Sequence, residues 1–245
     1  MSNRIEVSRS ALLHNFDLLA EASGLAPIPV VKSDGYGHGV GLVSKVLSER
    51  KPPYVAVNDI REAKTVQDVC DQPVLILGVV EAKDLNTLNC DKIAIYVHDK
   101  EFIKDLANLD RPMKVHLDID TGMKRYGIDV GELDEYLDLI EKYDNILLDG
   151  ISTHLADGIA SDFSFSKEQA AKFDGVAERV LARGFEPEHI HIANAPGFSK
   201  MHSKYANAFR PGIAIYGVNP LNEQDPNHDV MSGVHPAMKL ISTVT

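Results

Sequence analysis

The chain has 245 residues, the length of one large domain, and its 44% hydrophobic and 25% charged residues are typical of a soluble globular protein. A formal net charge of −11 argues against nucleic acids and anionic membranes as partners, because their binding proteins carry clustered Lys and Arg. Cys70 and Cys90 lack disulfide-rich or metal-like spacing, and no segment resembles a signal peptide or a membrane span. We therefore expect a cytoplasmic protein.

The N-terminal part of the chain predicts a helix, a buried strand and a glycine-rich loop. Ser8 is expected to cap a helix whose apolar positions continue at helical spacing to Leu19, and Gly24 would end it. The β-branched run IPVV then predicts a strand that ends at Lys32, and GYGHG follows as a loop.

From there, strands and helices alternate along the chain. Strands are expected at residues 28–31, 54–57, 73–77, 92–97, 113–119, 146–152, 189–194 and 212–217. Helices are expected at 40–50, 61–69, 101–109, 132–143 and 166–184. Eight strands separated mostly by helices predict an α/β fold, a closed (β/α)8 TIM-type barrel with a parallel sheet. A doubly wound open sheet is the alternative, because periodicity alone does not show that the sheet closes.

The amino-acid composition of the sequence changes after Tyr216. Residues 218–236 are rich in Asn, Asp, Pro and Gly, as in a linker, and MKLISTVT at 238–245 predicts a new strand with no partner after it. We therefore expect a barrel over residues 1–230, and over 231–245 the start of a β-rich second domain whose remainder is missing.

Polar residues next to the predicted strands are the candidates for chemistry, because barrel enzymes place reactive groups at the C-terminal ends of their strands. This criterion selects Lys32, Asp118, Asp120, Arg125, His154, Asn194 and Arg210. A lysine that ends a buried strand can lose its proton and form a Schiff base. The ordinary alternative is a lysine whose stem packs while its ammonium group reaches solvent.

Two loops favour a phosphate ligand over a metal ion. Glycines around Tyr36 would bring backbone and hydroxyl groups close to an anion, and Asn194 with the amides of Gly212 and Ile213 lies where barrels often bind phosphate. His189 and His191 share one face of a strand, but no third ligand has suitable spacing. We therefore expect no metal.

Five segments in order resemble motifs of the alanine racemase family. They are VVKSDGYGHG (usually written VVKANAYGHG), HLDIDTGMKRYG, ISTHLA, HIANAPG and RPGIAIYG, and together they extend over nearly the whole chain. The resemblance implies a fold-type III enzyme that uses pyridoxal 5'-phosphate (PLP). Lys32 would hold the cofactor covalently and act as the base on one face of the substrate.

The resemblance also assigns further residues to the cofactor. Those expected to bind the phosphate are Tyr36, Asn194, Ala195, Gly212 and Ile213. Ala195 stands where the family carries a serine, so only its backbone amide can contribute. Arg210 would face the pyridine nitrogen, which a guanidinium does not readily protonate. His154 would lie against the ring and orient Arg210.

Arg125 would lie near the substrate carboxylate, a role that suits its fork of donors. Many members of the family carry a carbamylated lysine where this chain has Asp118. We expect Asp118 to supply that negative charge directly and so position Arg125.

The implied reaction is racemization of L- and D-alanine, which supplies D-alanine for peptidoglycan. Racemization needs a base on each face of the α-carbon. In the family the second base is a tyrosine from the C-terminal domain of the partner in a homodimer, so we expect little or no activity from this chain alone. Two alternatives remain open: a PLP-binding barrel without turnover, and a racemase or lyase for another small amino acid such as serine.

Overall fold

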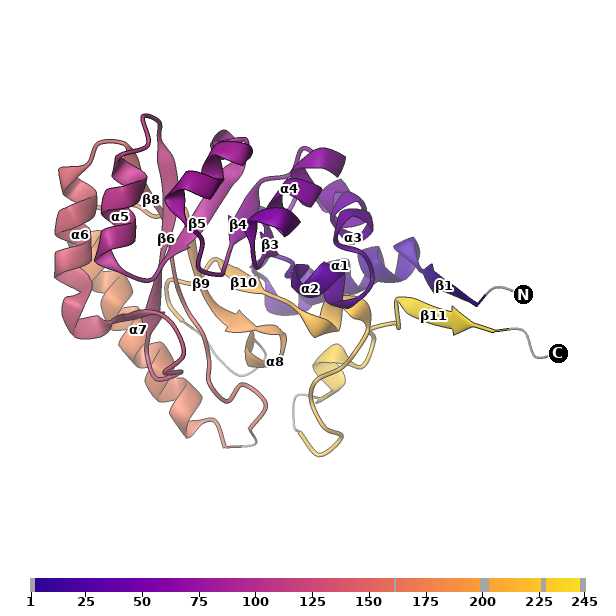
Figure 1. The fold of residues 1–245 in the computed structure, drawn as a ribbon. Coiled ribbons are helices and arrows are strands. Elements are labelled where there is room, and N and C mark those ends of the chain that lie inside the picture. Colours follow the sequence, from indigo (N-terminus) through magenta and orange to yellow (C-terminus); the bar gives the residue numbers. More distant parts are fainter. Residues whose placement is uncertain (1–2, 161, 199–202, 226–227, 243–245) are drawn as a thin grey trace.

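The computed structural model describes residues 3–160, 162–198, 203–225 and 228–242, most of which form one α/β barrel (Figure 1). Its parallel strands are β2 Ala26–Pro27, β3 Val55–Val57, β4 Val74–Ile76, β5 Ile93–Val97, β6 Met113–Asp120, β8 Ile146–Thr153, β9 His189–Asn194 and β10 Ala208–Arg210. The longer helices are α1 Arg9–Ser23, α3 Val40–Leu47, α4 Ile60–Val69, α5 Lys100–Ala107, α6 Leu133–Lys142 and α7 Ser164–Ala182, and the short ones are α2 Lys32–Tyr36 and α8 Ala195–Phe198. A short strand β7, Ile128–Asp129, pairs with β6.

The sheet is a closed barrel. Its strand order is β2-β10-β9-β8-β6-β5-β4-β3, and the segment after β2 joins the two ends. The Ile28 amide donates to the Phe209 carbonyl at 2.8 Å on one side. On the other side the Val31 amide donates to Ala56, and the Ala56 amide donates to Pro29, both at 2.8 Å. Because the segment that continues β2 bonds to β10 on one side and to β3 on the other, the prediction of a barrel is confirmed over that of an open sheet.

The core has two layers, as the alternation of side chains along strands requires. In β3, Val55 and Val57 pack outward with the helices, whereas Ala56 points into the barrel. The inner cluster also contains Ile28 and Tyr96. The interior is partly polar, because His116 of β6 and His191 of β9 are also fully buried.

Local signals set the helix ends where the sequence predicts them. The Ser8 side chain accepts a hydrogen bond from the Ala11 amide at the start of α1, and Asp59 and Asp99 cap α4 and α5 in the same way. Gly24 ends α1 in the left-handed conformation with φ 64°, which costs glycine no Cβ clash.

One predicted strand near the C-terminus is wrong. Residues 212–217 do not form the last strand: Ile213–Tyr216 is a 3-10 helix, and the eighth strand is β10, which ends at Arg210. The ladder stops there because Pro211 has no amide hydrogen and Gly212 leaves the β region, with φ −105° and ψ −104°.

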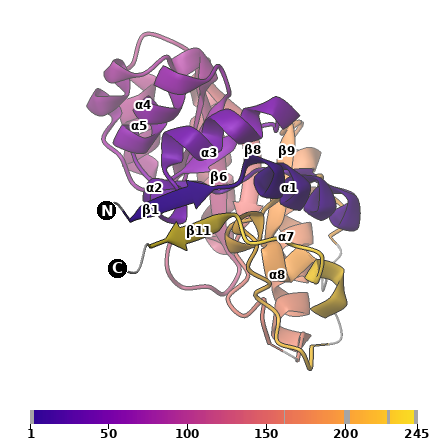
Figure 2. The same cartoon turned by 90° about the vertical axis from the view of Figure 1, so that its right-hand side faces the viewer.

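The strand near the C-terminus has a partner that comes from the start of the chain. Strand β11, Met238–Ile241, pairs antiparallel with β1, Arg4–Val7, so the expectation of an unpartnered strand is wrong. Figure 1 shows this two-stranded ribbon extending away from the barrel, and Figure 2 shows its two strands lying side by side. Ile5 and Leu240 on it are 58% and 73% exposed. Residues 243–245 of the predicted strand lie outside the described residues.

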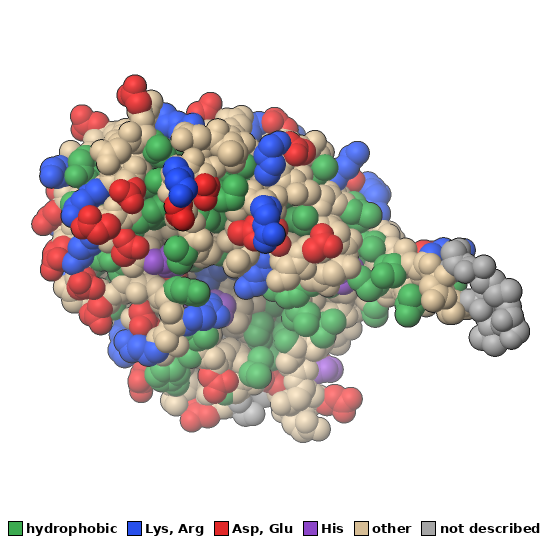
Figure 3. Space-filling view, viewed as in Figure 1, with side chains coloured by type: hydrophobic (Ala, Val, Ile, Leu, Met, Phe, Trp, Pro, Cys, Tyr) green, Lys and Arg blue, Asp and Glu red, His purple; other side chains and the backbone are tan. Residues whose placement is uncertain are grey.

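The helix-covered part of the surface seen in Figure 3 intermixes acidic and basic side chains. Ion pairs such as Lys100 with Glu132 join neighbouring helices there. Within the described part of the chain, no helix has the length and apolar character needed to cross a membrane.

Candidate active site

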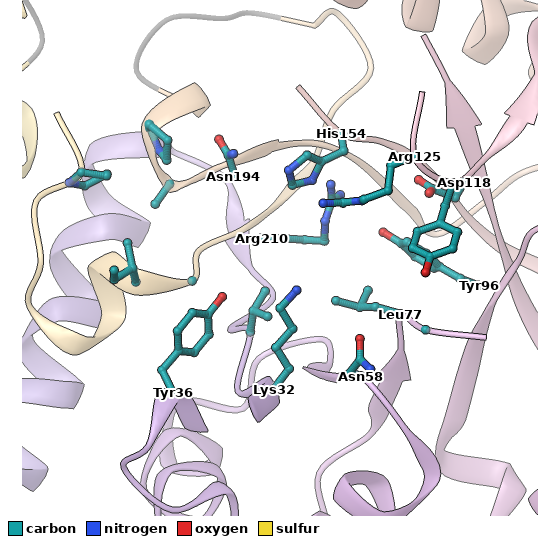
Figure 4. Close-up of a pocket in the computed structure, with 18 of the residues that line it drawn as sticks. Lys32, Tyr36, Asn58, Leu77, Tyr96, Asp118, Arg125, His154, Asn194 and Arg210 are labelled. Carbon is teal, nitrogen blue, oxygen red and sulfur yellow. The ribbon is translucent and has the colours of Figure 1, made fainter. Parts of the chain in front are cut away.

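A cavity of about 770 Å³ opens at the C-terminal ends of the barrel strands. It is lined by every residue that the family resemblance assigned to the site: Lys32, Tyr36, Asp118, Arg125, His154, Asn194, Ala195, Arg210, Gly212 and Ile213. Asp118 lies near the end of β6, His154 follows β8, and Asn194 and Arg210 end β9 and β10. Parallel strands bring these ends together, which is why residues far apart in the chain meet here (Figure 4).

Lys32 and Tyr36 enter the cavity from a left-handed turn. The four residues from Ser33 to Tyr36 have φ between 53° and 61°, a conformation that is unfavourable for residues other than glycine. The Asp34 carboxylate holds this turn by accepting from the Val40 amide at 2.9 Å, and the Asp34 amide donates to Glu62 at 3.0 Å. The turn places the Tyr36 hydroxyl against Gly212, where an added Cβ would lie 2.9 Å from that oxygen.

The amine of Lys32 is disposed to lose its proton. Burial lowers the pKa of Lys32, and the positive charges of Arg125 and Arg210 lower it further, whereas the charge of Glu62 acts in the opposite direction. A neutral amine is the nucleophilic form of lysine and also a base. In Figure 4 the Lys32 side chain extends from the base of the cavity toward Arg210 and His154.

Arg210 is buried and held by three hydrogen bonds. Its Nη1 donates to Nδ1 of His191 at 2.6 Å and to the His191 carbonyl at 3.0 Å, and its Nη2 donates to the Thr153 carbonyl at 2.7 Å. The expectation that His154 orients Arg210 is therefore wrong, because His191 and Thr153 hold the guanidinium. Burial, together with the charges of Arg210 and Arg125, lowers the pKa of His154 to about 3, so His154 is neutral at pH 7.

The expected ion pair between Asp118 and Arg125 is not formed in the described part of the chain. Asp118 accepts a hydrogen bond from the Ser152 hydroxyl at 2.9 Å on the neighbouring strand. Burial raises the pKa of Asp118, although the charges of Arg210 and Arg125 act against the rise. In Figure 4 the Arg125 guanidinium extends toward His154, whereas Asp118 lies beside Tyr96. Both residues face the same cavity, but Asp118 does not hold Arg125 directly.

Asp120, another residue selected by its place after a strand, does not line the cavity. Its carboxylate accepts from the amides of Gly122 at 2.9 Å and Lys124 at 3.1 Å, so it shapes the loop that carries Arg125. This is an indirect contribution to the site.

Sequence reasoning missed several residues of the site. Asn58, Leu77 and Tyr96 line the cavity, but Tyr96 lies within an apolar strand and has the pattern of an ordinary core residue. His189 and His191 alternate along β9, and the sequence suggested for them only the role of metal ligands. The described residues contain no group of His, Cys, Asp and Glu side chains that suits a metal ion, and His191 instead supports Arg210.

Comparison with known proteins agrees with this geometry. Residues 7–220 match the family model described as alanine racemase, N-terminal domain. The chain is 32% identical to an alanine racemase of Geobacter sp. (strain M21) over 243 residues, covering 93% of this chain and 64% of that protein. It is 29% identical to alanine racemase 2 of Caldanaerobacter subterraneus, covering 97% of this chain and 63% of that protein. The chain thus spans less than two thirds of the length of these relatives.

Solved structures give the same result. An alanine racemase of Clostridium difficile 630 in complex with cycloserine aligns with a TM-score of 0.89 at 25% identity, covering 98% of this chain and 67% of that one. The alanine racemase of Bacillus anthracis with bound L-Ala-P aligns with a TM-score of 0.86 at 28% identity, covering 97% and 63%. The chain belongs to the alanine racemase family and corresponds to the N-terminal domain of that family.

Proposed function

We propose that this chain is the cofactor-binding barrel of a PLP-dependent isomerase that interconverts L- and D-alanine. The observation that carries the proposal is the convergence of a lysine with a lowered pKa and a buried arginine on one cavity at the barrel mouth. Membership of the alanine racemase family and the names of the relatives support alanine as the substrate.

The residues of the cavity fit pyridoxal phosphate. Lys32 offers an amine for the cofactor aldehyde. Gly212 leaves open the space beside the Tyr36 hydroxyl that a Cβ would fill, and Ile213 begins a short helix whose first amides have no partner within it, a suitable cradle for phosphate. We infer that Asn194 and the backbone of Ala195 complete this cradle.

The remaining residues suit the ring and the substrate. Bound PLP would supply an electron sink that acidifies the α-hydrogen of an attached amino acid. Arg210 can only donate hydrogen bonds, so it would leave the ring nitrogen unprotonated. His154, neutral at pH 7, would lie against the ring. Arg125 would bind the substrate carboxylate, and Asp118 would shape that side of the cavity.

Lys32 can transfer a proton on only one face of the substrate, and racemization requires a second group on the other face. We propose that this group comes from a second domain, borne by the partner in a homodimer, in the part of the relatives that lies outside the matched region. We further propose that the barrel extends over residues 1–230 and that 231–245 begin this domain, with the β1–β11 ribbon at its base.

The first test is cofactor binding. Wild-type chain with added PLP is expected to show a visible absorbance band that Lys32→Ala abolishes. Absence of the band from the wild type, or its persistence in the variant, would contradict the proposal.

The second test is proton exchange in D2O, followed separately for L- and D-alanine by NMR. With one base present, one enantiomer should exchange its α-hydrogen without inversion, and Lys32→Ala should abolish exchange. Exchange of neither enantiomer would favour a carrier barrel, and faster exchange of serine than of alanine would favour a different substrate. Rapid inversion by this chain alone would refute the assignment of the second base to another domain.

A further inference from the structure

A buried row of polar side chains inside the barrel leads away from the cavity. It consists of Arg210, His191, His116 and Asp149, and we name it the Arg210–Asp149 relay. His191 accepts from Arg210 through Nδ1 at 2.6 Å, its Nε2 lies 2.9 Å from Nδ1 of His116, and Nε2 of His116 lies 3.1 Å from Oδ2 of Asp149. Both histidines are fully buried, so no solvent competes for these hydrogen bonds.

The two ends of the relay determine which nitrogen of each histidine carries the proton. A guanidinium only donates, so Nδ1 of His191 must accept; a carboxylate only accepts, so Nε2 of His116 must carry hydrogen. The two requirements agree in the middle, where Nε2–H of His191 donates to Nδ1 of His116. Every hydrogen bond therefore runs in one direction, from Arg210 to Asp149.

Both rings are neutral in this arrangement. Burial lowers the pKa of His191 well below its usual value, and the positive charge of Arg210 adds to the effect. Burial also lowers the pKa of His116, although the adjacent Asp149 carboxylate opposes the shift. A neutral histidine with one donor and one acceptor is what a one-directional chain requires.

The backbone is shaped to admit the carboxylate. Val115 of β6 pairs with Leu148, but the next residue, His116, pairs with Gly150, so Asp149 is an extra residue in β8. A bulge of this kind redirects a side chain, and here the carboxylate reaches the interior histidine. Gly150 is required beside it, because a Cβ there would overlap the His116 ring.

Asp149 is anionic and has several charged or polar neighbours. Burial opposes its charged form, but hydrogen bonds from His116, Lys114 and Tyr54 outweigh this and hold the pKa of Asp149 well below its usual value. The Lys114 ammonium lies 2.6 Å away, the Tyr54 hydroxyl donates at 2.7 Å, and Nε2 of His189 lies 3.8 Å away.

We propose that Asp149, acting through His116 and His191, is the remote counter-ion of Arg210 and positions its guanidinium toward the cofactor ring. His191, His116 and Asp149 are positioning residues in this proposal, since only Arg210 reaches the cavity. The part that concerns the cofactor rests on the proposed function; the direction of the hydrogen bonds does not.

The first experiment needs no cofactor. The chain is labelled with 15N-histidine, and the ring protonation of His116 and His191 is read from long-range 1H–15N correlations between pH 6 and 8. Both rings are expected to be neutral and to carry hydrogen on Nε2 alone. Hydrogen on Nδ1, or an imidazolium at either position, would overturn the relay.

The second experiment compares two variants of one residue by their dissociation constants for PLP. In His191→Asn the side-chain oxygen can occupy the place of Nδ1 and accept from Arg210, whereas His191→Leu offers no acceptor. By analogy with residues that orient metal ligands, His191→Leu is expected to raise the Kd roughly 10- to 100-fold, and His191→Asn should recover most of the loss. Equal losses in the two variants would overturn the positioning role.

A third comparison tests the distant end. Asp149→Asn removes the charge, whereas the matched control Tyr54→Phe removes one hydrogen bond to the same carboxylate and keeps the charge. By the same analogy, Asp149→Asn is expected to raise the Kd for PLP about tenfold and Tyr54→Phe by less than about twofold, with circular dichroism confirming that both variants fold. Equal effects would refute the counter-ion role. If the wild type does not bind PLP, the proposed function is refuted. The direction of the hydrogen bonds in the relay is still tested in that case, because the histidine tautomers are measured without the cofactor.

Discussion

Gly150→Ala is expected to destabilise the barrel severely for a change of one methyl group. The added Cβ would lie 2.5 Å from Cε1 and 2.8 Å from Cγ of His116, and it would also contact Nδ1. His116 is fully buried and bonded at both ends of its ring, so it has no space into which to move. Overpacking of a core costs about 1–3 kcal/mol. A buried polar group left without its partner costs about 1–3 kcal/mol more.

Together these terms predict a loss of about 2–6 kcal/mol in the free energy of unfolding, measured by urea denaturation. Gly175→Ala is the matched control, because Gly175 lies within α7 and a Cβ there meets nothing within 4 Å. This change should stabilise the protein by about 0.5–1 kcal/mol, because alanine favours a helix over glycine. A Gly150→Ala variant within about 0.5 kcal/mol of the wild type would refute the packing argument, since the expected loss is at least about four times larger.

Two further predictions concern pH and the phosphate cradle. The pKa of His154 falls from its ordinary value near 6.5 to about 3 on folding, so below pH 6.5 the unfolded state binds a proton that the folded state does not. The free energy of unfolding should therefore fall as pH falls from 6.5 to 5. When this free energy is measured by urea denaturation across that range, its change per pH unit should be smaller in His154→Gln than in the wild type by up to about 1.4 kcal/mol. An equal change per pH unit in the two proteins would contradict the lowered pKa of His154. Gly212→Ala, whose Cβ would lie 2.9 Å from the Tyr36 hydroxyl, should raise the Kd for PLP roughly tenfold or more, as about 1.4 kcal/mol of lost binding implies. Tyr36→Phe in the same background should add little to that loss, and fully additive effects in a fluorescence titration would argue against a shared cradle.

Much of the fold was predictable because the helices have local signals. Ser8 and Gly24 mark the ends of α1, and seven of the eight predicted strand segments contribute to the barrel wall. The eighth was misplaced by the apolar run at 213–216, which looks like a strand but follows Pro211 and Gly212. A backbone that leaves the β region there is not apparent from hydrophobicity.

The sequence by itself determined which residues meet at the mouth of the barrel. Parallel strands end on one side, so Lys32 and His154 could be grouped from the predicted strands, whereas Arg210 precedes the strand predicted at 212–217 and was assigned to the site by the resemblance. Only the tertiary structure decided which neighbours hold them. Arg210 is hydrogen-bonded to His191 and not to His154, and Asp118 is hydrogen-bonded to Ser152 and not to Arg125.

The structure alone decided between the closed barrel and the open sheet, and it alone revealed the bulge at Asp149 and the pairing of β1 with β11. The physical reason is the range of the interactions. Caps, turns and periodicity depend on neighbours a few residues away, whereas strand register and buried hydrogen bonds join residues up to 237 positions apart, such as Arg4 and Ile241, whose pairing no local pattern records.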